Sequence, residues 1–304
     1  MKFRIVIPTF NSAKTLPAAV ESALAQEHDD FFVVVSDNGS TDGSAEYLRG
    51  VSHPRLQSVL NEEKLPKTEN WNRAFSQGPA AEYLVMLHSD DVLYPQALQR
   101  IDETLRRFPD AVMVFGNHDR LAVDGGTVIS KSCWPLAYCV DHTEFARMQL
   151  ASNNVSVVGA TFRADAFQRI GGFDRQYDYV QDLLIYDSMS KLGPVAYSPH
   201  KFGQYRDTPI RPAVAPLWAR EQMKWIALAT SELPASLRRR MIKAHAAGEI
   251  DKLHREAPEA VKAFVAELAQ QGIQPGSVKA MRRFQRVTAL ALKLKASLFS
   301  LCSR

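Results

Sequence analysis

The sequence contains few cysteines. Of its 304 residues only Cys133, Cys139 and Cys302 are cysteine. An odd number at wide spacing argues against a disulfide framework and against a cysteine-based zinc site. It favours a reducing compartment.

Long apolar runs and a strong charge are also missing. No stretch approaches the roughly 20 apolar residues of a membrane-spanning helix. Pro8 interrupts the first apolar run, MKFRIVIPTF, too early for a signal peptide. The net charge of +4 implies no nucleic-acid partner by itself. We therefore expect a cytoplasmic globular protein.

Two glycine-rich nucleotide motifs are absent as well. No Gly-x-Gly-x-x-Gly follows any expected strand, which argues against a dehydrogenase. A nucleotidyltransferase would need a glycine-rich, basic phosphate loop after the first strand, and IPTFNSAKT has neither two glycines nor an arginine.

The first part of the chain alternates apolar runs with helix patterns. Runs at 3–8, 31–35, 56–60, 82–88 and 111–116 predict buried strands. Between them, 15–26, 44–50, 68–78 and 95–108 predict helices. Strands separated by helices imply crossover units and a mostly parallel α/β sheet.

A different pattern follows residue 116. We expect a hairpin over 120–130 with its turn at Asp124-Gly125-Gly126, strands at 155–163 and 195–199, and a helix at 182–193. From about Pro216 onward the chain predicts helices, with breaks near Pro234, Gly248, Pro258 and 272–275.

Polar clusters follow three of the predicted strands. They are Thr9-Phe10-Asn11, Asp37-Asn38 and His88 to Asp91. Ligands of such sheets bind at the carboxyl ends of the strands, so the three clusters together predict a site. Asp90 and Asp91 suit a divalent cation, although Asp before a helix is also a common cap.

Two further carboxylates have alternative interpretations. Asp37 suits a base N–H or a ribose hydroxyl, but residues 36–42 (SDNGSTD) also form a natural turn. Asp182 lies at the start of a predicted helix, where the helix dipole stabilises a carboxylate. This position suits a general base, and it also suits an ordinary first-turn aspartate.

Seven segments resemble the motifs of family 2 glycosyltransferases. In order they are VIPTFN, SDNGSTD, ENWNRAF, LHSDDVLYP, GGFD, QDLLIY and YSPHKFGQYR, within about residues 3–208. The resemblance implies an inverting, nucleotide-sugar-dependent enzyme. It also implies the A-type glycosyltransferase fold, a Rossmann-like, mostly parallel sheet flanked by helices.

The resemblance implies a role for each matching residue. For the donor nucleotide these are Pro8, Thr9, Asn11, Asp37, Asn72, His88 and Ser89. Asp90 would bind Mn²⁺ or Mg²⁺ on the diphosphate, with Asp91 beside it, and Asp182 would be the catalytic base.

The chain departs from the family pattern at three positions. His88 replaces the first acid of Asp-x-Asp, and histidine can ligate Mn²⁺ or hydrogen-bond the donor. Gln181 replaces the Glu before the base. The usual His after the Tyr-Arg pair is missing, and His200 is a candidate substitute or an ordinary loop histidine.

Arg206 and Asp174, which lie in these motifs, each have two possible roles. Arg206 could contact the diphosphate or pin its loop. Gly172, Asp174 and Gln181 would shape the acceptor side, although Asp174 could equally close the turn.

The last segment is basic and apolar. Residues 281–304 contain six basic residues and no acid, interleaved with leucines and phenylalanines. Such a helix can lie on an anionic membrane, or it can pack on the catalytic domain.

These observations predict two domains. Residues 1–212 form the catalytic domain, with a nucleotide-binding half at 1–116 and an acceptor half at 117–212, and residues 213–304 form a helical extension. The predicted donor is a UDP-, GDP- or dTDP-sugar. The predicted acceptor is a glycan or lipid-linked hydroxyl in surface polysaccharide synthesis, at the inner face of the cytoplasmic membrane. The alternative is an inactive nucleotide-sugar-binding or scaffold protein of the same fold.

Overall fold

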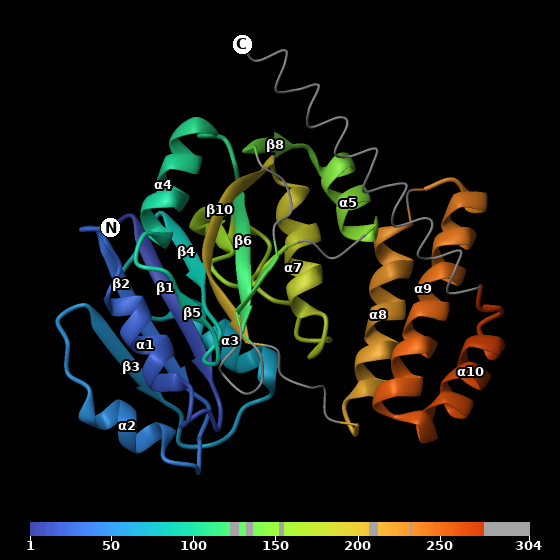
Figure 1. Ribbon diagram of the computed structural model, residues 1–304, viewed down its shortest axis with the longest axis horizontal. Helices are drawn as coiled ribbons and strands as arrows, with labels where there is room; N and C mark the ends of the chain where they lie inside the picture. Colours follow the sequence, from blue (N-terminus) through green and yellow to red (C-terminus); the bar gives the residue numbers. More distant parts are fainter. Residues whose placement is uncertain (122–127, 132–135, 152–154, 207–211, 232, 277–304) are drawn as a thin grey trace. The chain divides into compact units, whose positions relative to one another are not determined.

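The computed structural model describes residues 1–121, 128–131, 136–151, 155–206, 212–231 and 233–276 (Figure 1). The strands are β1 Phe3–Thr9, β2 Phe31–Asp37, β3 Leu56–Leu60, β4 Tyr83–Met86, β5 Val92–Leu93, β6 Met113–Leu121, β7 Val128–Lys131, β8 Tyr138–Val140, β9 Thr161–Arg163 and β10 Val195–Arg206. The helices are α1 Leu16–Leu24, α2 Ser44–Gly50, α3 Lys67–Ser76, α4 Ala97–Arg107, α5 His142–Ala151, α6 Ala164–Arg169, α7 Gln181–Ser190, α8 Ala215–Ala229, α9 Ala235–Glu256 and α10 Val261–Gln270, with a short 3₁₀ turn, η1, at Pro258–Ala260.

The chain forms two compact units. The first consists of Met1–Phe145, Asn154–Asp178 and Ile185–Asp207. The second consists of Ala146–Asn153, Tyr179–Leu184 and Thr208–Arg304. The predicted division at residues 212 and 213 into separate domains stays a prediction.

One mixed sheet organises the first unit. Its strand order is β3-β2-β1-β4-β9-β6-β10-β5, with β7 beside β6 and β8 beside β10. The neighbours β3, β2, β1 and β4 are parallel, whereas β9 runs antiparallel between β4 and β6. The α/β class is therefore confirmed, with a mixed sheet whose parallel part is formed by β3, β2, β1 and β4 and by the pair β6 and β10.

The strand order reverses direction at β1. The chain moves from β1 to β2 to β3 on one side, and then returns to place β4 on the other side of β1. Loops diverge at such a switch point and leave a crevice at the carboxyl ends of the strands. The loops after β1 and β4 are the ones predicted to carry the site.

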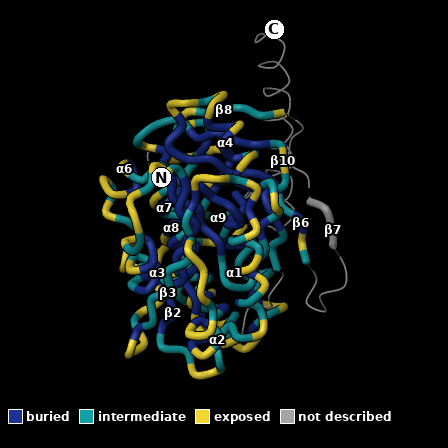
Figure 2. Tube along the Cα trace, turned by 90° about the vertical axis from the view of Figure 1, so that its left-hand side faces the viewer, coloured by how far each residue is buried: buried dark blue, intermediate teal, exposed yellow. Residues whose placement is uncertain are grey.

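Continuous apolar runs explain why these strands lie at the centre. Every residue of β1 and of β4 is buried, as expected for strands covered on both faces. The helices α1 and α3 pack against β1 and β2, and α4 packs against β6 and β10. Figure 2 colours the Cα trace by burial and shows buried segments inside the fold, with many exposed residues in the surrounding loops.

Several predicted elements differ in extent. The predicted strand 155–163 is reduced to β9, and the strand expected at 195–199 continues to Arg206 as β10. The hairpin over 120–130 is confirmed by antiparallel pairing of β6 with β7, and its turn lies outside the described residues. The patterns missed β8 and α5.

The second unit contains α8, α9 and α10, as the helical prediction for this region expected. Its core gathers Ala219, Met223, Ala246, Leu253 and Phe264. The break predicted near Gly248 was wrong, since α9 continues through it. A glycine costs only about 1 kcal/mol inside a helix, and the burial of Ala246 and Leu253 on either side outweighs that cost. Among the described residues, no helix has the length and apolar content needed to cross a bilayer.

Candidate active site

The loop after β1 is a tight turn braced from the segment after β2. Asn11 adopts a left-handed backbone conformation with φ of 51°. Its amide nitrogen donates to Ser40 Oγ at 2.8 Å, and its Oδ1 accepts from the Thr41 N–H at 2.9 Å. Asparagine tolerates this conformation better than other non-glycine residues. Asn11 therefore shapes the loop that carries Thr9.

Asp37 lies at the carboxyl end of β2 and is 1% exposed. Its Oδ2 accepts from the Ser40 N–H at 3.0 Å, closing the turn that the Asp-Asn-Gly-Ser sequence predicts. Its Oδ1 is buried and has no hydrogen-bond partner. One oxygen thus shapes the turn, while the other is left for a ligand donor.

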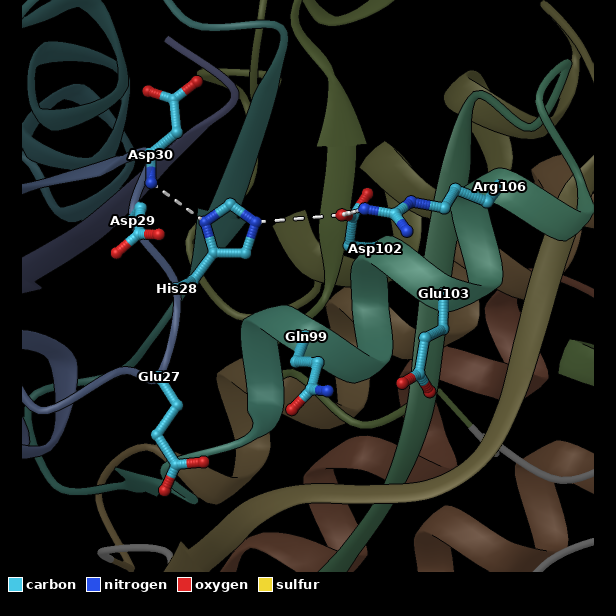
Figure 3. A pocket seen from close by; sticks show the side chains of 8 residues that line it. All are labelled: Glu27, His28, Asp29, Asp30, Gln99, Asp102, Glu103 and Arg106. Carbon is cyan, nitrogen blue, oxygen red and sulfur yellow. Dashed lines mark hydrogen bonds and ion pairs between the residues drawn. The ribbon is translucent and has the colours of Figure 1, made fainter.

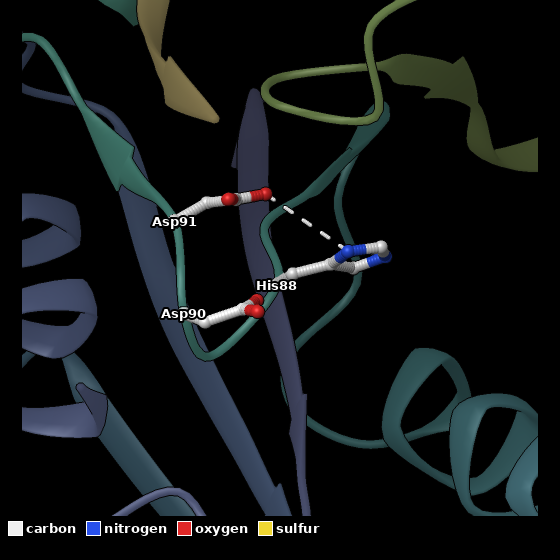
Figure 4. A group of neighbouring side chains, drawn as sticks. All are labelled: His88, Asp90 and Asp91. Carbon is white, nitrogen blue, oxygen red and sulfur yellow. Dashed lines mark ion pairs between the residues drawn. The ribbon is translucent and has the colours of Figure 1, made fainter. Parts of the chain in front are cut away.

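The turn after β4 groups three potential metal ligands. One ligand atom each from His88, Asp90 and Asp91 lies within 4.8 Å of the others. Figure 4 shows the three side chains projecting from the turn to the same side. The turn closes through a hydrogen bond from the Asp91 N–H to the His88 carbonyl at 3.2 Å. Among the described residues it is the one such group of three.

His88 is neutral at physiological pH in this environment. Burial lowers the pKa of its imidazole to about 4; the charge of Asp90 acts in the opposite direction and that of Lys67 lowers the pKa further. Its Nδ1 lies 3.9 Å from Asp91 Oδ2, and its Nε2 is buried without a hydrogen-bond partner. A neutral imidazole keeps a lone pair that can bind a cation.

Asp91 connects the turn to the last residue of β10. The Arg206 N–H donates to Asp91 Oδ1 at 2.8 Å, and Arg206 Nε donates to the Asp90 carbonyl at 3.0 Å. Burial and the charge of Asp90 raise the pKa of the Asp91 carboxyl well above its usual range. Arg206 thus pins the loop, and its predicted contact with the diphosphate stays a prediction.

A hydroxyl pair joins the two loops at the switch point. Ser12 Oγ and Ser89 Oγ lie 2.8 Å apart, although 77 positions separate them in the chain. Ser12 also donates its backbone N–H to Ser44 Oγ at 3.0 Å. The predicted site residues Thr9, Asp37, Ser89 and Asp90 all lie at the carboxyl ends of the strands, on one edge of the sheet.

Each of four neighbouring strands ends in at least one buried polar atom without a hydrogen-bond partner. At the carboxyl ends of β1, β2, β3 and β4, such atoms are Thr9 Oγ1, Asp37 Oδ1, Asn61 Oδ1, His88 Nε2 and Asp91 Oδ2. Folded proteins satisfy nearly all buried polar groups, so orphaned atoms at the ends of four neighbouring strands indicate a place built for a polar ligand.

The donor set fits a divalent cation of the Mg²⁺ or Mn²⁺ type. Such cations prefer oxygen ligands and often bind through one or two carboxylates, and Mn²⁺ also accepts an imidazole. Asp90 supplies a carboxylate at the open turn, Asp91 Oδ2 is buried without a hydrogen-bond partner, and His88 Nδ1 faces that oxygen at 3.9 Å.

Asn72 pins a turn. Its Nδ2 donates to the Phe173 carbonyl, and its Oδ1 accepts from the Phe173 N–H, both at 2.8 Å. Gly172 has a φ of 80° and approaches Asn72 so closely that a Cβ would collide with Oδ1. Asn72 was predicted at the nucleotide, but its amide is engaged by this turn.

The remaining predicted residues are placed as follows. Asp174 Oδ1 accepts from the Gln176 N–H at 2.9 Å and so closes a turn. In the second unit, Gln181 is 1% exposed, its Oε1 has no partner, and Asp182 lies in the first turn of α7. His200 is exposed on β10 and is not one of the three grouped side chains. Pro8 is a buried residue of β1.

Lys67 and Trp71 adjoin the site. Lys67 lies over the ring of Trp71 at 5.1 Å, and Trp71 in turn packs against His88 with ring centroids 5.1 Å apart. A tryptophan at this position suits either core packing or stacking on a ligand, and Trp71 is 7% exposed. No sequence signal joins it to His88, because the contact arises only when α3 packs beside β4.

A second hollow lies near the opposite edge of the sheet, where β2 begins (Figure 3). It has a volume of about 480 Å³ and is lined largely by carboxylates, together with His28, Gln99 and Arg106. Its buried acid, Asp102, is ion-paired with Lys2 at 2.5 Å and with Arg106 at 2.8 Å. These charges compensate one another, so this hollow is a poorer candidate than the strand ends.

The sequence matches characterised families over its first half. Residues 4–170 match the family model described as glycosyl transferase family 2, a segment that ends before Asp182. The chain is 26% identical to the chondroitin synthase of Escherichia coli over 193 residues, 62% of this chain and 26% of the synthase. It is 28% identical to a PGL/p-HBAD biosynthesis glycosyltransferase of Mycobacterium bovis over 186 residues, 59% of this chain and 66% of that protein. The chain thus spans about a quarter of the length of the synthase it matches.

Solved structures share the fold. The crystal structure of Staphylococcus aureus TarS 1–349 in complex with UDP-GlcNAc superposes with a TM-score of 0.62 and 16% identity, covering 89% of this chain and 78% of that one. The mannosyltransferase PcManGT from Pyrobaculum calidifontis, in complex with GDP-Man and Mn²⁺, superposes with a TM-score of 0.56 and 18% identity, covering 96% and 87%. These likenesses confirm the predicted A-type glycosyltransferase fold.

Proposed function

Since the chain belongs to glycosyl transferase family 2, we propose that it transfers a sugar from a nucleotide-sugar donor to an acceptor hydroxyl with inversion at the sugar carbon. The observation that carries this proposal is the set of orphaned buried atoms at the carboxyl ends of β1 to β4. They lie at the strand-order switch, beside the group of His88, Asp90 and Asp91.

The donor nucleotide is assigned to the loops after β1 and β2. Asp37 Oδ1 is a buried acceptor for a base N–H or a ribose hydroxyl, and Thr9 Oγ1 lies at the end of the adjacent strand. Asn11 and Ser12 hold the first loop in the conformation that presents Thr9. Ser89 connects this region to the metal-ligand turn.

The diphosphate is assigned to the turn after β4. Asp90 would hold a divalent cation, with neutral His88 and Asp91 as the neighbouring ligands. The bound cation supplies positive charge that stabilises the departing diphosphate. Arg206 keeps the turn in place through the Asp90 carbonyl and Asp91, so its part in transfer is to position the ligands.

Asp182 is assigned the role of general base, from its place in the QDLLIY motif and in the first turn of α7. Its carboxylate takes the proton of the acceptor hydroxyl as that oxygen bonds to the sugar carbon. The bond from that carbon to the diphosphate oxygen breaks, and its electron pair leaves with the nucleoside diphosphate. Attack opposite to the leaving group inverts the configuration.

The acceptor class follows from the relatives. One relative is named a chondroitin synthase, and another is named a PGL/p-HBAD biosynthesis glycosyltransferase. We assign this chain a hydroxyl of a glycan or lipid-linked acceptor, in surface polysaccharide synthesis on the cytoplasmic side of the membrane. Gly172, Asp174 and Gln181 are assigned to the acceptor side, and residues 281–304 to contact with an anionic membrane surface.

Calorimetry tests the assignment of donor and metal. UDP, GDP and dTDP are titrated into the protein with and without Mn²⁺ or Mg²⁺. We expect one nucleotide to bind only with a cation, and Asp90→Asn to weaken that binding at least about 10-fold. Asp29→Asn, which removes an exposed carboxylate outside the site, is the matched control and should bind normally.

Two results would decide against the proposal. Absence of cation-dependent binding of any of the three nucleotides rules out the metal-dependent enzyme. Cation-dependent binding without transfer to any acceptor would instead favour the alternative, an inactive nucleotide-sugar-binding protein of the same fold.

A further inference from the structure

The first half of α9 has an unusual charge distribution. Residues 235–248 contain Arg238, Arg239, Arg240 and Lys243 and no acid, whereas all three acids of this helix lie in its last eight residues. In the described part of the chain, no carboxylate lies within ion-pair distance of these four cations. Elsewhere in the same unit Arg220 pairs with Glu267, and Arg255 pairs with Asp251.

This distribution opposes the stability of the helix. Positive side chains near a helix amino terminus repel the positive end of its dipole. Arg239 and Lys243 lie four residues apart, a spacing at which like charges repel on one helix face. The first turn contains no acid, and Pro234 before it provides no capping side chain. A charge pattern that costs stability indicates a function outside folding.

The same residues line a groove. It has a volume of about 260 Å³ and is bordered by Arg238, Arg239 and Lys243, with Ile242 and Ile273 among its apolar lining residues. The loop after α10 closes one side, held by a hydrogen bond from the Gly276 N–H to the Lys243 carbonyl at 2.9 Å. The groove therefore combines cationic groups with an apolar lining.

An exposed leucine follows a residue that Arg238 contacts. Arg238 Nη2 donates to the Ala227 carbonyl at 3.4 Å, which brings the end of α8 next to the groove. The following residue, Leu228, is 52% exposed. A soluble anion would gain nothing from this side chain, whereas a bilayer offers both phosphate groups and an apolar layer.

The sequence that follows the groove has the same character. Five residues after Gly276 begins the segment 281–304, with six basic residues, no acid and a high content of leucine. The chain therefore carries two basic stretches that also contain apolar residues, 235–248 and 281–304.

We propose that the groove formed by Arg238, Arg239, Ile242, Lys243 and Ile273, together with Leu228, binds the surface of an anionic phospholipid bilayer. Headgroup phosphates would occupy the cationic rim, and Leu228 would enter the interfacial layer. This membrane contact is separate from residues 281–304 and does not depend on the transferase reaction, since none of its residues belongs to the proposed site.

Vesicle flotation with the full-length protein tests this proposal. The probes are vesicles of phosphatidylglycerol and phosphatidylcholine, compared with phosphatidylcholine alone. We expect binding only to the anionic vesicles. Each basic residue near such a surface contributes about 1 kcal/mol, so Arg239→Gln with Lys243→Gln should weaken binding about 30-fold. The control, Arg107→Gln with Lys262→Gln, removes the same charge from two exposed residues outside the groove.

Thermal unfolding separates a membrane role from a structural one. Because the cations oppose the helix, the groove variant should melt at the same temperature as the parent or higher. A lower melting temperature would overturn the proposal in favour of a structural role. Equal weakening by the control pair, or no binding to anionic vesicles, would also overturn it. Competition by millimolar inorganic phosphate as effective as that by vesicles would identify a small-anion site instead.

Discussion

The indole of Trp71 packs against the imidazole of His88, with ring centroids 5.1 Å apart and ring planes inclined by 54°. Trp71 lies on α3, and His88 lies in the turn after β4. The contact holds the histidine that replaces the first acid of the family motif, and it buries the imidazole enough to keep it neutral. Unlike the acid it replaces, this side chain therefore adds no third negative charge beside Asp90 and Asp91.

His88→Asp should destabilise the protein when no cation is bound. A third carboxylate would lie against Trp71 and beside Asp90 and Asp91, where burial disfavours charge. We expect a loss of roughly 2 kcal/mol or more in the free energy of unfolding, restored by millimolar Mn²⁺. Scanning calorimetry with EDTA or Mn²⁺ measures both. A variant as stable as the parent in EDTA contradicts this account; His254→Asp, at an exposed histidine, is the control.

Asp182→Asn should abolish transfer and leave donor binding intact. Asparagine has nearly the same shape as aspartate but cannot accept the proton of the acceptor hydroxyl. We expect turnover to fall at least about 100-fold, with the nucleotide Kd changed less than twofold. Turnover rates with a nucleotide-sugar donor, and calorimetry with the nucleotide, measure the two effects. Undiminished turnover would remove Asp182 as the base.

Glu249→Gln should change how stability depends on pH. Burial raises the pKa of the Glu249 carboxyl from 4.5 to about 8, with Lys252 lowering it and Glu256 raising it. Because the folded state holds a proton that the unfolded state has released, stability falls as the pH rises from 4.5 to 8. The contribution to the slope is at most about 1.4 kcal/mol per pH unit.

The glutamine variant lacks this titration. It should therefore gain stability relative to the parent as the pH rises from 5 to 8, and no further above that range. Urea unfolding at pH 5, 6.5 and 8 measures the difference. Parallel pH profiles for the two proteins would show that Glu249 does not titrate in this range. Glu259→Gln, at an exposed glutamate, is the control.

Neutralising the basic segment tests its predicted membrane contact. In the full-length chain, Arg282, Arg283 and Arg286 are changed together to glutamine. If this segment meets an anionic bilayer, vesicle binding should weaken by up to about two orders of magnitude. Vesicle flotation measures this, and unchanged binding would leave packing on the protein as its role. Combining this set with the groove substitutions shows whether the two contacts add.

Local sequence patterns were sufficient to predict the strands that carry the candidate site. Mostly apolar runs predicted β1, β2, β3 and β4, because strands that are covered on both faces, as β1 and β4 are, contain few polar residues. The polar residues that end these runs, Thr9, Asp37 and Asp90, were recognised for the same reason, since solvent or ligand begins where the apolar run stops.

Contacts between segments that are distant in the sequence could be identified only from the tertiary structure. The hydroxyl pair of Ser12 and Ser89 exists because β4 returns to the far side of β1, and no local pattern encodes that return. Asn72 matched a nucleotide-binding motif, yet its amide is engaged by Phe173, 101 positions away. Side-chain chemistry limits what a residue can do, but packing decides which partner it meets.

The sequence by itself determined the fold class, the edge of the sheet that holds the candidate site and the carboxylates most suited to a cation. Each of these depends on the order of apolar and polar residues along the chain. Only the tertiary structure decided that β9 inserts antiparallel between β4 and β6, that Trp71 covers His88, and that cations on α9, which pair with no carboxylate in the described part of the chain, line a groove. Those features depend on which surfaces pack together, and that packing is determined by the burial of residues that lie far apart in the sequence.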